Sequence, residues 1–208
     1  MRERSGQRQR DPPLSHYDRS VTHDEAVGLI SSARLTSSPG PATWADLGCG
    51  DGTFTLALAS LLPAGSTIYA VDRDAAALRA LPDRVHGSRI VPQQADFTHL
   101  PWPFAELDGV LMANSLHYVR HHDAFVRSCA PQLRAHHQFL IVEYDLRRGN
   151  PWVPYPLDQN SARQLFTDLG YTSLSILGTR PSLYQRGSLY AMLATAHPTA
   201  PRSDKIAV

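Results

Sequence analysis

A glycine turn between an apolar run and a helical pattern constrains this chain more than any other feature. Glycines alternate with other residues at positions 48, 50 and 52, within the stretch Asp46-Leu47-Gly48-Cys49-Gly50-Asp51-Gly52. An apolar run, residues 42–45, precedes this turn, and a helical pattern follows it. The order strand, glycine turn, helix is how α/β folds build a nucleotide pocket. The sequence therefore predicts a ligand site at this turn.

The spacing of the glycines indicates which nucleotide the turn accepts. A dinucleotide fingerprint, G-x-G-x-x-G, would place its third glycine at position 53, where this chain has Thr53. Alternating glycines instead let the backbone lie flat against a ligand without phosphates, while the N–H groups of the next helix remain available to a carboxylate. These features favour a ligand with a nucleoside at one end and an amino acid at the other. A plain strand-to-helix turn is the alternative.

Apolar runs and helical patterns alternate along the chain and predict a doubly wound, Rossmann-like α/β fold. Runs such as 109–112 and 139–142 are apolar throughout, which is typical of a mostly parallel sheet covered on both faces. The last two strands follow each other without a helix, which predicts an antiparallel strand at the C-terminal edge. We expect seven strands, at 43–47, 67–71, 88–91, 107–113, 138–144, 172–177 and 188–193, and helices at 23–34, 53–62, 74–81, 123–133 and 161–169.

Bulk properties limit the organisation and the partners of the chain. It has 208 residues, of which 42% are apolar, and this suits one domain. We expect a disordered arm at 1–14, a single domain at 15–196 and a flexible tail at 197–208. A net charge of +1 gives no electrostatic reason to expect nucleic acid, so a small-molecule partner is favoured. Two cysteines, no secretory signal and no apolar run of ~20 residues predict a cytoplasmic protein without a membrane span; the oligomeric state is not indicated.

Polar residues at the ends of three predicted strands are candidate ligand contacts. Asp72 ends the second strand about 20 residues after the glycine turn, where a carboxylate can accept both hydroxyls of a ribose. Arg73 beside it is assigned to the same site. Asp96 and Phe97 follow the third strand, where Asp96 could accept from an adenine amine while Phe97 presents its backbone N–H, and Asn114 ends the fourth strand. Two plainer roles remain open: Asp72 as a helix cap and Asp96 in an Asx turn.

The segment after the fourth strand supplies the candidate catalytic residues. His117 is the leading proton acceptor because imidazole titrates near neutral pH, although it equally suits a purely structural role in the loop. Tyr118, Tyr17 and Tyr155 are candidates for the wall of an acceptor pocket. Arg147 and Arg148 could equally bind a substrate carboxylate or simply be solvated. No metal is expected, because the nearby histidines at 121 and 122 fall in a predicted solvated loop.

Taken together, these motifs resemble the class I S-adenosylmethionine-dependent methyltransferases. The glycine turn is similar to their motif I, Asp96-Phe97 to their adenine-binding pair, and Leu116-His117-Tyr118 to the Leu-His-His of the group that acts in ubiquinone and menaquinone biosynthesis (methyltransferase domain 11/25). The resemblance covers about residues 42–145. It implies S-adenosyl-L-methionine as cofactor, bound by residues that include Asp46 near its ammonium group, the glycines and Cys49 of the turn, Asp72, Arg73, Asp96, Phe97 and Asn114.

Two departures from the family pattern limit what the resemblance implies. The Lys-Pro-Gly-Gly turn expected before the fifth strand is replaced by residues 133–137, which adopt positive φ less readily than glycine. The Asn/Asp-Pro-Pro-Tyr motif of nucleic-acid amino methyltransferases is absent after the fourth strand, which disfavours base methylation. The expected activity is methyl transfer by in-line displacement to carbon, oxygen or nitrogen of a small molecule. A catalytically silent binding or scaffold protein and an NAD(P)-dependent oxidoreductase are the alternatives.

Overall fold

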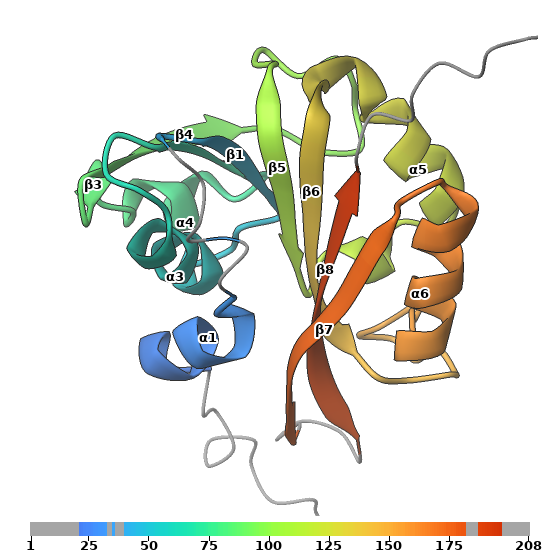
Figure 1. Ribbon diagram of the computed structural model, residues 1–208. Coiled ribbons are helices and arrows are strands. Elements are labelled where there is room, and N and C mark those ends of the chain that lie inside the picture. Colours follow the sequence, from blue (N-terminus) through green and yellow to red (C-terminus); the bar gives the residue numbers. More distant parts are fainter. Residues whose placement is uncertain (1–20, 33–34, 36–39, 182–186, 197–208) are drawn as a thin grey trace, which may run out of the picture.

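A single mixed sheet forms the centre of the molecule (Figure 1). The computed structural model describes residues 21–32, 35, 40–181 and 187–196. Its strands lie in the order β3-β4-β2-β1-β5-β6-β8-β7. Their bounds are β1 (Thr43–Leu47), β2 (Thr67–Asp72), β3 (Arg84–Val85), β4 (Ser88–Gln94), β5 (Leu107–Ala113), β6 (Leu133–Tyr144), β7 (Ser173–Pro181) and β8 (Ser188–Ala196).

Helices cover both faces of this sheet. They are α1 (His23–Ile30), α3 (Thr53–Leu61), α4 (Ala75–Arg79), α5 (His122–Ser128) and α6 (Gln159–Asp168), with 3-10 turns η1 (Leu116–Tyr118) and η2 (Ala130–Gln132). Figure 1 shows α1, α3 and α4 on one face and α5 and α6 on the other. Alternate strand residues feed two separate cores: Trp44 and Leu111 pack with the first group of helices, and Ala45 and Met112 with the second. The prediction of a sheet buried on both faces is therefore confirmed.

The strand directions confirm the predicted fold class and add one strand. β4, β2, β1, β5 and β6 are parallel, and β8 runs antiparallel to both β6 and β7. The eighth strand is the two-residue β3, which the sequence analysis did not expect. It forms a hairpin with β4 through His86 and Gly87, whose φ values of 48° and 83° suit the tight turns that join twisted strands.

Helix limits follow from local chemistry. Thr22 caps α1, and its side chain and that of Glu25 form a reciprocal capping box. The predicted helix at 123–133 is too long at its C-terminal end. α5 ends at Ser128 because Pro131, which has no N–H to donate, falls in the next turn, and the chain passes through η2 into β6 at Leu133.

Residues 133–137 do not form the turn that the sequence analysis expected. None of these five residues, all of them described, has a positive φ, because they already belong to β6. Instead, the register between β5 and β6 shifts from the pair Leu107–Leu133 to the pair Gly109–Gln138. The extra residues of β6 between these two pairs form a bulge. The imidazole Nδ1 of His137 lies 2.7 Å from the Arg134 carbonyl oxygen and braces this bulge.

The topology places a crevice at the carboxyl ends of β1 and β5. β1 pairs with β2 on one side and with β5 on the other, so the chain order reverses between them. Open α/β sheets bind their ligands at such a switch point. Within the described residues, no helix is long and apolar enough to span a bilayer. The predicted arm at 1–14 and tail at 197–208 lie outside the described residues, so the domain limits remain predictions.

Gly109 offers a test of the packing between β1 and β5. A Cβ atom at this position would lie 2.5 Å from the Trp44 ring, whereas at Gly28 of α1 it would meet nothing within 4 Å. We expect Gly109→Ala to lower the free energy of unfolding by about 1–3 kcal/mol through overpacking. The control Gly28→Ala should raise it by up to about 1 kcal/mol, because alanine favours helix. Urea denaturation measures both; equal stability of the two variants would contradict this packing.

Candidate functional site

The glycine turn adopts a backbone that explains its alternating sequence. Gly48, Gly50 and Gly52 all have positive φ, at 78°, 52° and 85°. A Cβ atom on Gly48 would lie 2.7 Å from Ser115 Cβ and 3.2 Å from the Phe97 ring. The turn therefore packs closely against the segments after β5 and β4, and only glycine combines this conformation with this closeness.

Asp72 fastens the glycine turn to the end of β2. Its Oδ2 accepts the Gly50 N–H at 2.9 Å, and its Oδ1 accepts the Asp74 N–H at 2.9 Å. The cap of α4 is Asp74 itself, whose Oδ1 accepts the Ala76 N–H at 2.8 Å. The role of helix cap, which the sequence left open for Asp72, therefore belongs to Asp74. Each carboxylate oxygen has more than one lone-pair site, so both can still accept from a ligand.

Two cavities meet at this turn. The first, of about 300 Å³, contains Asp46, Gly48, Cys49, Gly50 and Asn114 among its lining residues. The second, of about 490 Å³, is lined by the other predicted cofactor residues Asp72, Arg73, Asp96 and Phe97, and also by Gly48, Asn114, Ser115 and Tyr118. Gly48 and Asn114 belong to both cavities. Gly52 lines neither, because it sits against Leu81 at the start of α3.

Two buried oxygen atoms in the first cavity have no partner among the described residues. Asp46, only 1% exposed, accepts the Thr55 hydroxyl on Oδ2 at 2.5 Å, and its Oδ1 accepts nothing. The pKa of Asp46 is raised to about 7. Burial is the main cause; the Thr55 hydroxyl acts in the opposite direction, and the charge on Asp72 adds to the increase. The second atom is Oδ1 of Asn114, held at the end of β5 with φ 54°. A donor entering this cavity would satisfy both oxygens.

The carboxylate of Asp51 lies at the N-terminus of α3. Asp51 Oδ1 accepts the Thr53 N–H at 3.1 Å and the Thr53 hydroxyl at 2.9 Å. From the sequence, the N–H groups at the start of α3 were expected to be available to a ligand carboxylate. In the structure, however, the Thr53 N–H donates to Asp51. This wall of the cavity is therefore negatively charged. Burial raises the pKa of the Cys49 thiol, so that side chain fills space as a neutral group.

Asp96 forms the Asx turn that the sequence left open and also lines the second cavity. Its Oδ1 accepts the Thr98 hydroxyl at 2.6 Å and the Thr98 N–H at 2.9 Å, which is an Asx turn. These bonds, the hydroxyl first, hold the pKa of Asp96 below its usual value. Oδ2 lies 3.4 Å from His99 at the surface, and the residue also lines the second cavity. The Asx turn therefore orients a carboxylate whose second oxygen remains available.

His117 is buried beside a carboxylate. Its Nδ1 lies 2.6 Å from Glu143 Oε2, and its N–H donates to Glu143 Oε1 at 3.1 Å. The side chains are 2% and 0% exposed. The His117 ring does not line either cavity but is flanked by two residues that do, with ring centroids 4.4 Å from Tyr118 and 6.1 Å from Tyr144.

The other acceptor-pocket candidates are placed differently. Tyr118 is 57% exposed at the second cavity, and Tyr155 is 38% exposed, with its N–H donating to the His117 carbonyl at 3.0 Å. Tyr17 lies outside the described residues. Within the described ranges, no group of three or more His, Cys, Asp or Glu residues is arranged to hold a metal ion.

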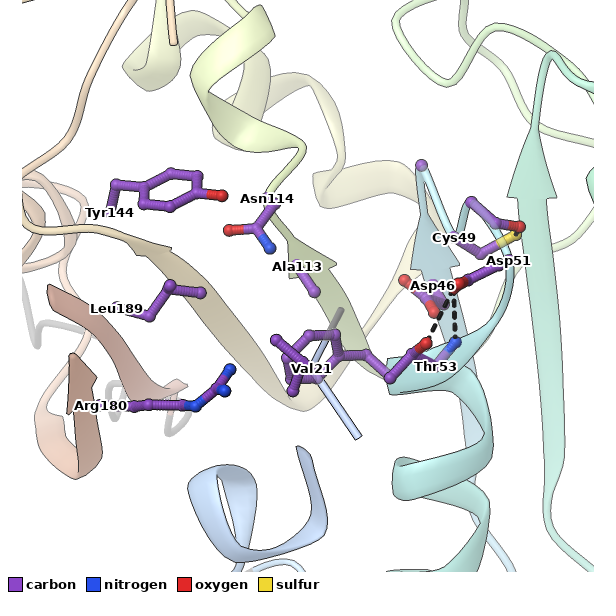
Figure 2. Close-up of a pocket in the computed structure, with 13 residues that line it drawn as sticks. Val21, Asp46, Cys49, Asp51, Thr53, Ala113, Asn114, Tyr144, Arg180 and Leu189 are labelled. Carbon is purple, nitrogen blue, oxygen red and sulfur yellow. Dashed lines mark hydrogen bonds between the residues drawn. The ribbon is translucent and has the colours of Figure 1, made fainter. Parts of the chain in front are cut away.

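Sequence reasoning missed several residues at the site. The chain brings them in from distant elements: Val21 before α1, Ser115 after β5, Glu143 and Tyr144 at the end of β6, Arg180 at the end of β7 and Leu189 in β8. Figure 2 shows Tyr144, Arg180 and Leu189 on the opposite side of the first cavity from Asp46, Cys49 and Thr53. For Ser115, Glu143 and Tyr144 the signal was their position at strand carboxyl ends. No sequence signal pointed to Arg180.

Comparisons with known proteins agree with this geometry. Residues 45–136 match the family model described as a methyltransferase domain. This segment of the chain is similar to a class I methyltransferase domain. The predicted resemblance to the methyltransferase 11/25 type is confirmed, and S-adenosylmethionine is the cofactor that such a domain implies. A search of curated proteins finds no match.

Solved structures support the methyltransferase fold. The YcgJ protein from Bacillus subtilis is 12% identical with a TM-score of 0.62, over 85% of this chain and 100% of its own. A putative methyltransferase from Bacillus halodurans is 13% identical with a TM-score of 0.62, over 84% and 99%. The plantazolicin methyltransferase BpumL, solved in complex with SAH, is 16% identical with a TM-score of 0.58, over 83% and 82%. At these identities the likeness concerns the fold.

The residues present fit the implied cofactor. A Cβ atom at Gly50 would meet nothing within 4 Å, so the backbone there faces open space that admits a ligand, and the unpartnered Asp46 and Asn114 oxygens suit the donors of an amino-acid group. The carboxylates of Asp72 and Asp96 border the second cavity, which suits a nucleoside.

Asp46 gives the stability of the free methyltransferase domain a pH dependence. Because its folded-state pKa is raised from 3.8 to about 7, its favourable contribution is fully present below about pH 4 and is lost as pH rises to about 7. We expect Asp46→Asn to reduce the loss of unfolding free energy over this interval. Urea denaturation at pH 4, 5.5 and 7 measures the effect. An identical pH profile in the variant and the wild type would contradict this assignment.

Proposed function

We propose that this protein transfers the methyl group of S-adenosylmethionine to a small-molecule acceptor by in-line displacement. The observation that carries the proposal is the pair of cavities that share Gly48 and Asn114. One cavity suits a nucleoside and the other an amino-acid end, so the sulfonium that joins these two halves would lie near the shared residues. The family match of residues 45–136 supports the same activity.

Each end of the cofactor has candidate partners. In the second cavity Asp72 would accept from the ribose hydroxyls, Asp96 Oδ2 from the adenine amine, and Phe97 would cover the ring. Arg73 borders the same space. In the first cavity Asp46 Oδ1 and Asn114 Oδ1 would accept from the ammonium group. Cys49, Gly50 and Gly48 would form the floor.

The protein contributes mainly by positioning. The sulfonium makes the methyl group electrophilic when the cofactor is bound. The chain then has to hold an acceptor atom in line with the S–CH₃ bond and exclude water, an effect that reaches ~7–11 kcal/mol in the best cases. The wall formed by Tyr144, Leu189 and Val21 would hold the acceptor against the methyl group.

His117 and Glu143 are positioned to move a proton. Glu143 would accept hydrogen bonds from the backbone N–H and from the Nδ1–H of His117. These two bonds would fix the imidazole tautomer and leave Nε2 as the proton acceptor. This arrangement favours an acceptor with a hydroxyl or an acidic C–H, which must lose a proton when it is methylated. Because the ring is only 2% exposed, an acceptor would reach it by displacing the neighbouring Tyr118 or Tyr144 ring.

Cofactor binding is tested most directly at Asp72. We expect the wild type to bind S-adenosylhomocysteine, and Asp72→Asn to weaken this binding by about 10- to 100-fold, because charge-assisted hydrogen bonds to the ribose are lost. Asp83→Asn, a change at an exposed position outside both cavities, is the matched control and should bind as the wild type does. Isothermal titration calorimetry measures all three. No heat with the wild type at millimolar ligand would overturn the proposed function.

The proton-transfer role is tested separately from binding. With a methyl-labelled cofactor and a metabolite extract as acceptor source, we expect Glu143→Gln to form labelled product about 10²- to 10⁴-fold more slowly than the wild type. Its affinity for S-adenosylhomocysteine and its unfolding temperature should change little, since glutamine keeps an oxygen for the His117 N–H. Unchanged product formation would remove the base role. No product with the wild type, despite cofactor binding, would favour the catalytically silent alternative.

A further inference from the structure

Arg180 gives the far wall of the first cavity a positive charge. It stands near the end of β7, at the edge of the sheet, and shares this wall with Tyr144 and Leu189, while Val21 lies between the two walls (Figure 2). Its side chain is only 18% exposed. Among the described residues that line this cavity, Arg180 is the one cationic side chain. Charged side chains usually lie in solvent, but Arg180 is mostly buried at this wall, so solvation does not account for its position.

Arg180 already holds one carboxylate and has donors left over. Its Nη2 donates to Glu25 Oε1 at 2.9 Å, the single hydrogen bond that the described part of the chain gives it. Glu25 in turn accepts from the N–H and hydroxyl of Thr22, and these bonds, more than Arg180, lower the pKa of Glu25. A guanidinium has five N–H donors arranged to pair with a carboxylate through two parallel bonds. Within the described ranges nothing takes the remaining donors, and the side chain lines the cavity.

The opposite wall repels an anion. Asp46 and Asp51 line it, and the Thr53 N–H at the start of α3 is taken by Asp51. A ligand carboxylate in this cavity would therefore be attracted to Arg180 and away from the glycine turn. With Glu25, Asp46 and Asp51 all nearby, one guanidinium suits a single negative charge better than a phosphate dianion.

We infer that the methyl acceptor carries a carboxylate, which Arg180 binds through a bidentate pair while its apolar part packs against Leu189 and Val21. This inference rests on the proposed function and names the substrate class of the same site. Arg147, for which the sequence left both a substrate carboxylate and simple solvation open, is 81% exposed and pairs with Asp158 at 3.7 Å, which agrees with the solvated alternative.

The test uses matched acids and amides on protein saturated with S-adenosylhomocysteine. The probes are benzoate against benzamide and hexanoate against hexanamide, with dissociation constants measured by ligand-observed NMR titration. We expect the wild type to bind at least one acid at millimolar concentration and more tightly than its amide. Arg180→Gln should weaken acid binding by about 10- to 100-fold and leave amide binding unchanged. Arg163→Gln, which removes the same charge from an exposed position on α6, should behave as the wild type does.

A second arm distinguishes the acceptor from the carboxylate of the cofactor itself. Calorimetry compares S-adenosylhomocysteine with 5′-methylthioadenosine, which lacks the amino-acid group. We expect Arg180→Gln to bind both as the wild type does. Weaker binding of S-adenosylhomocysteine alone would assign Arg180 to the cofactor and overturn the inference. Equal binding of acid and amide, or no acid binding by the wild type, would also overturn it, whereas a wild type that binds no S-adenosylhomocysteine would instead refute the proposed function.

Discussion

The carboxylate of Asp72 is the interaction on which the site depends. It accepts the Gly50 N–H and so joins the turn after β1 to the end of β2. Together with the Gly48 and Cys49 N–H groups, which donate to the Val71 carbonyl at 2.8 and 3.0 Å, this bond restrains three alternating left-handed glycines, which would otherwise be mobile because glycine loses more conformational freedom on folding than other residues. With it, the turn stays close to Ser115 and Phe97, and the two cavities share a fixed edge. The same carboxylate could still accept from a ribose, so in the proposed function one side chain would both build the pocket and contact the ligand.

Much of this architecture could be predicted because it depends on short-range patterns. The strands Thr43–Leu47 and Leu107–Ala113 have the predicted limits, since a buried parallel strand is a continuous apolar run. The glycine turn and Asp72 follow from spacing within one βαβ unit. Errors arose where one residue overrides its neighbours: Pro131 ended a helix early, and His86-Gly87 made a hairpin that no apolar run announced.

The far wall of the first cavity could not be predicted for a different reason. Arg180 is 155 residues from Glu25 along the chain, and only the pairing of β7 with β8 and the docking of α1 bring them together. Neither residue lies in a motif. Glu143 is an intermediate case: the sheet rule identifies the carboxyl end of its strand, but only the register of β6 turns its side chain towards His117. Residues near a motif are thus easier to assign than residues that face it from another element.

In the proposed function, where Asp46 pairs with the ammonium group of the cofactor, its buried carboxyl would make ligand exchange an acid–base event. A group with a pKa of about 7 is protonated in part of the free molecules at neutral pH, and it has to lose that proton before it can pair with an ammonium ion. Binding of either the methyl donor or its demethylated product would therefore release protons, and departure would take them up again. Because both ligands carry the same ammonium group, acidification would weaken the binding of both. A change in pH would therefore alter the occupancy of the nucleotide site, whichever of the two ligands is present.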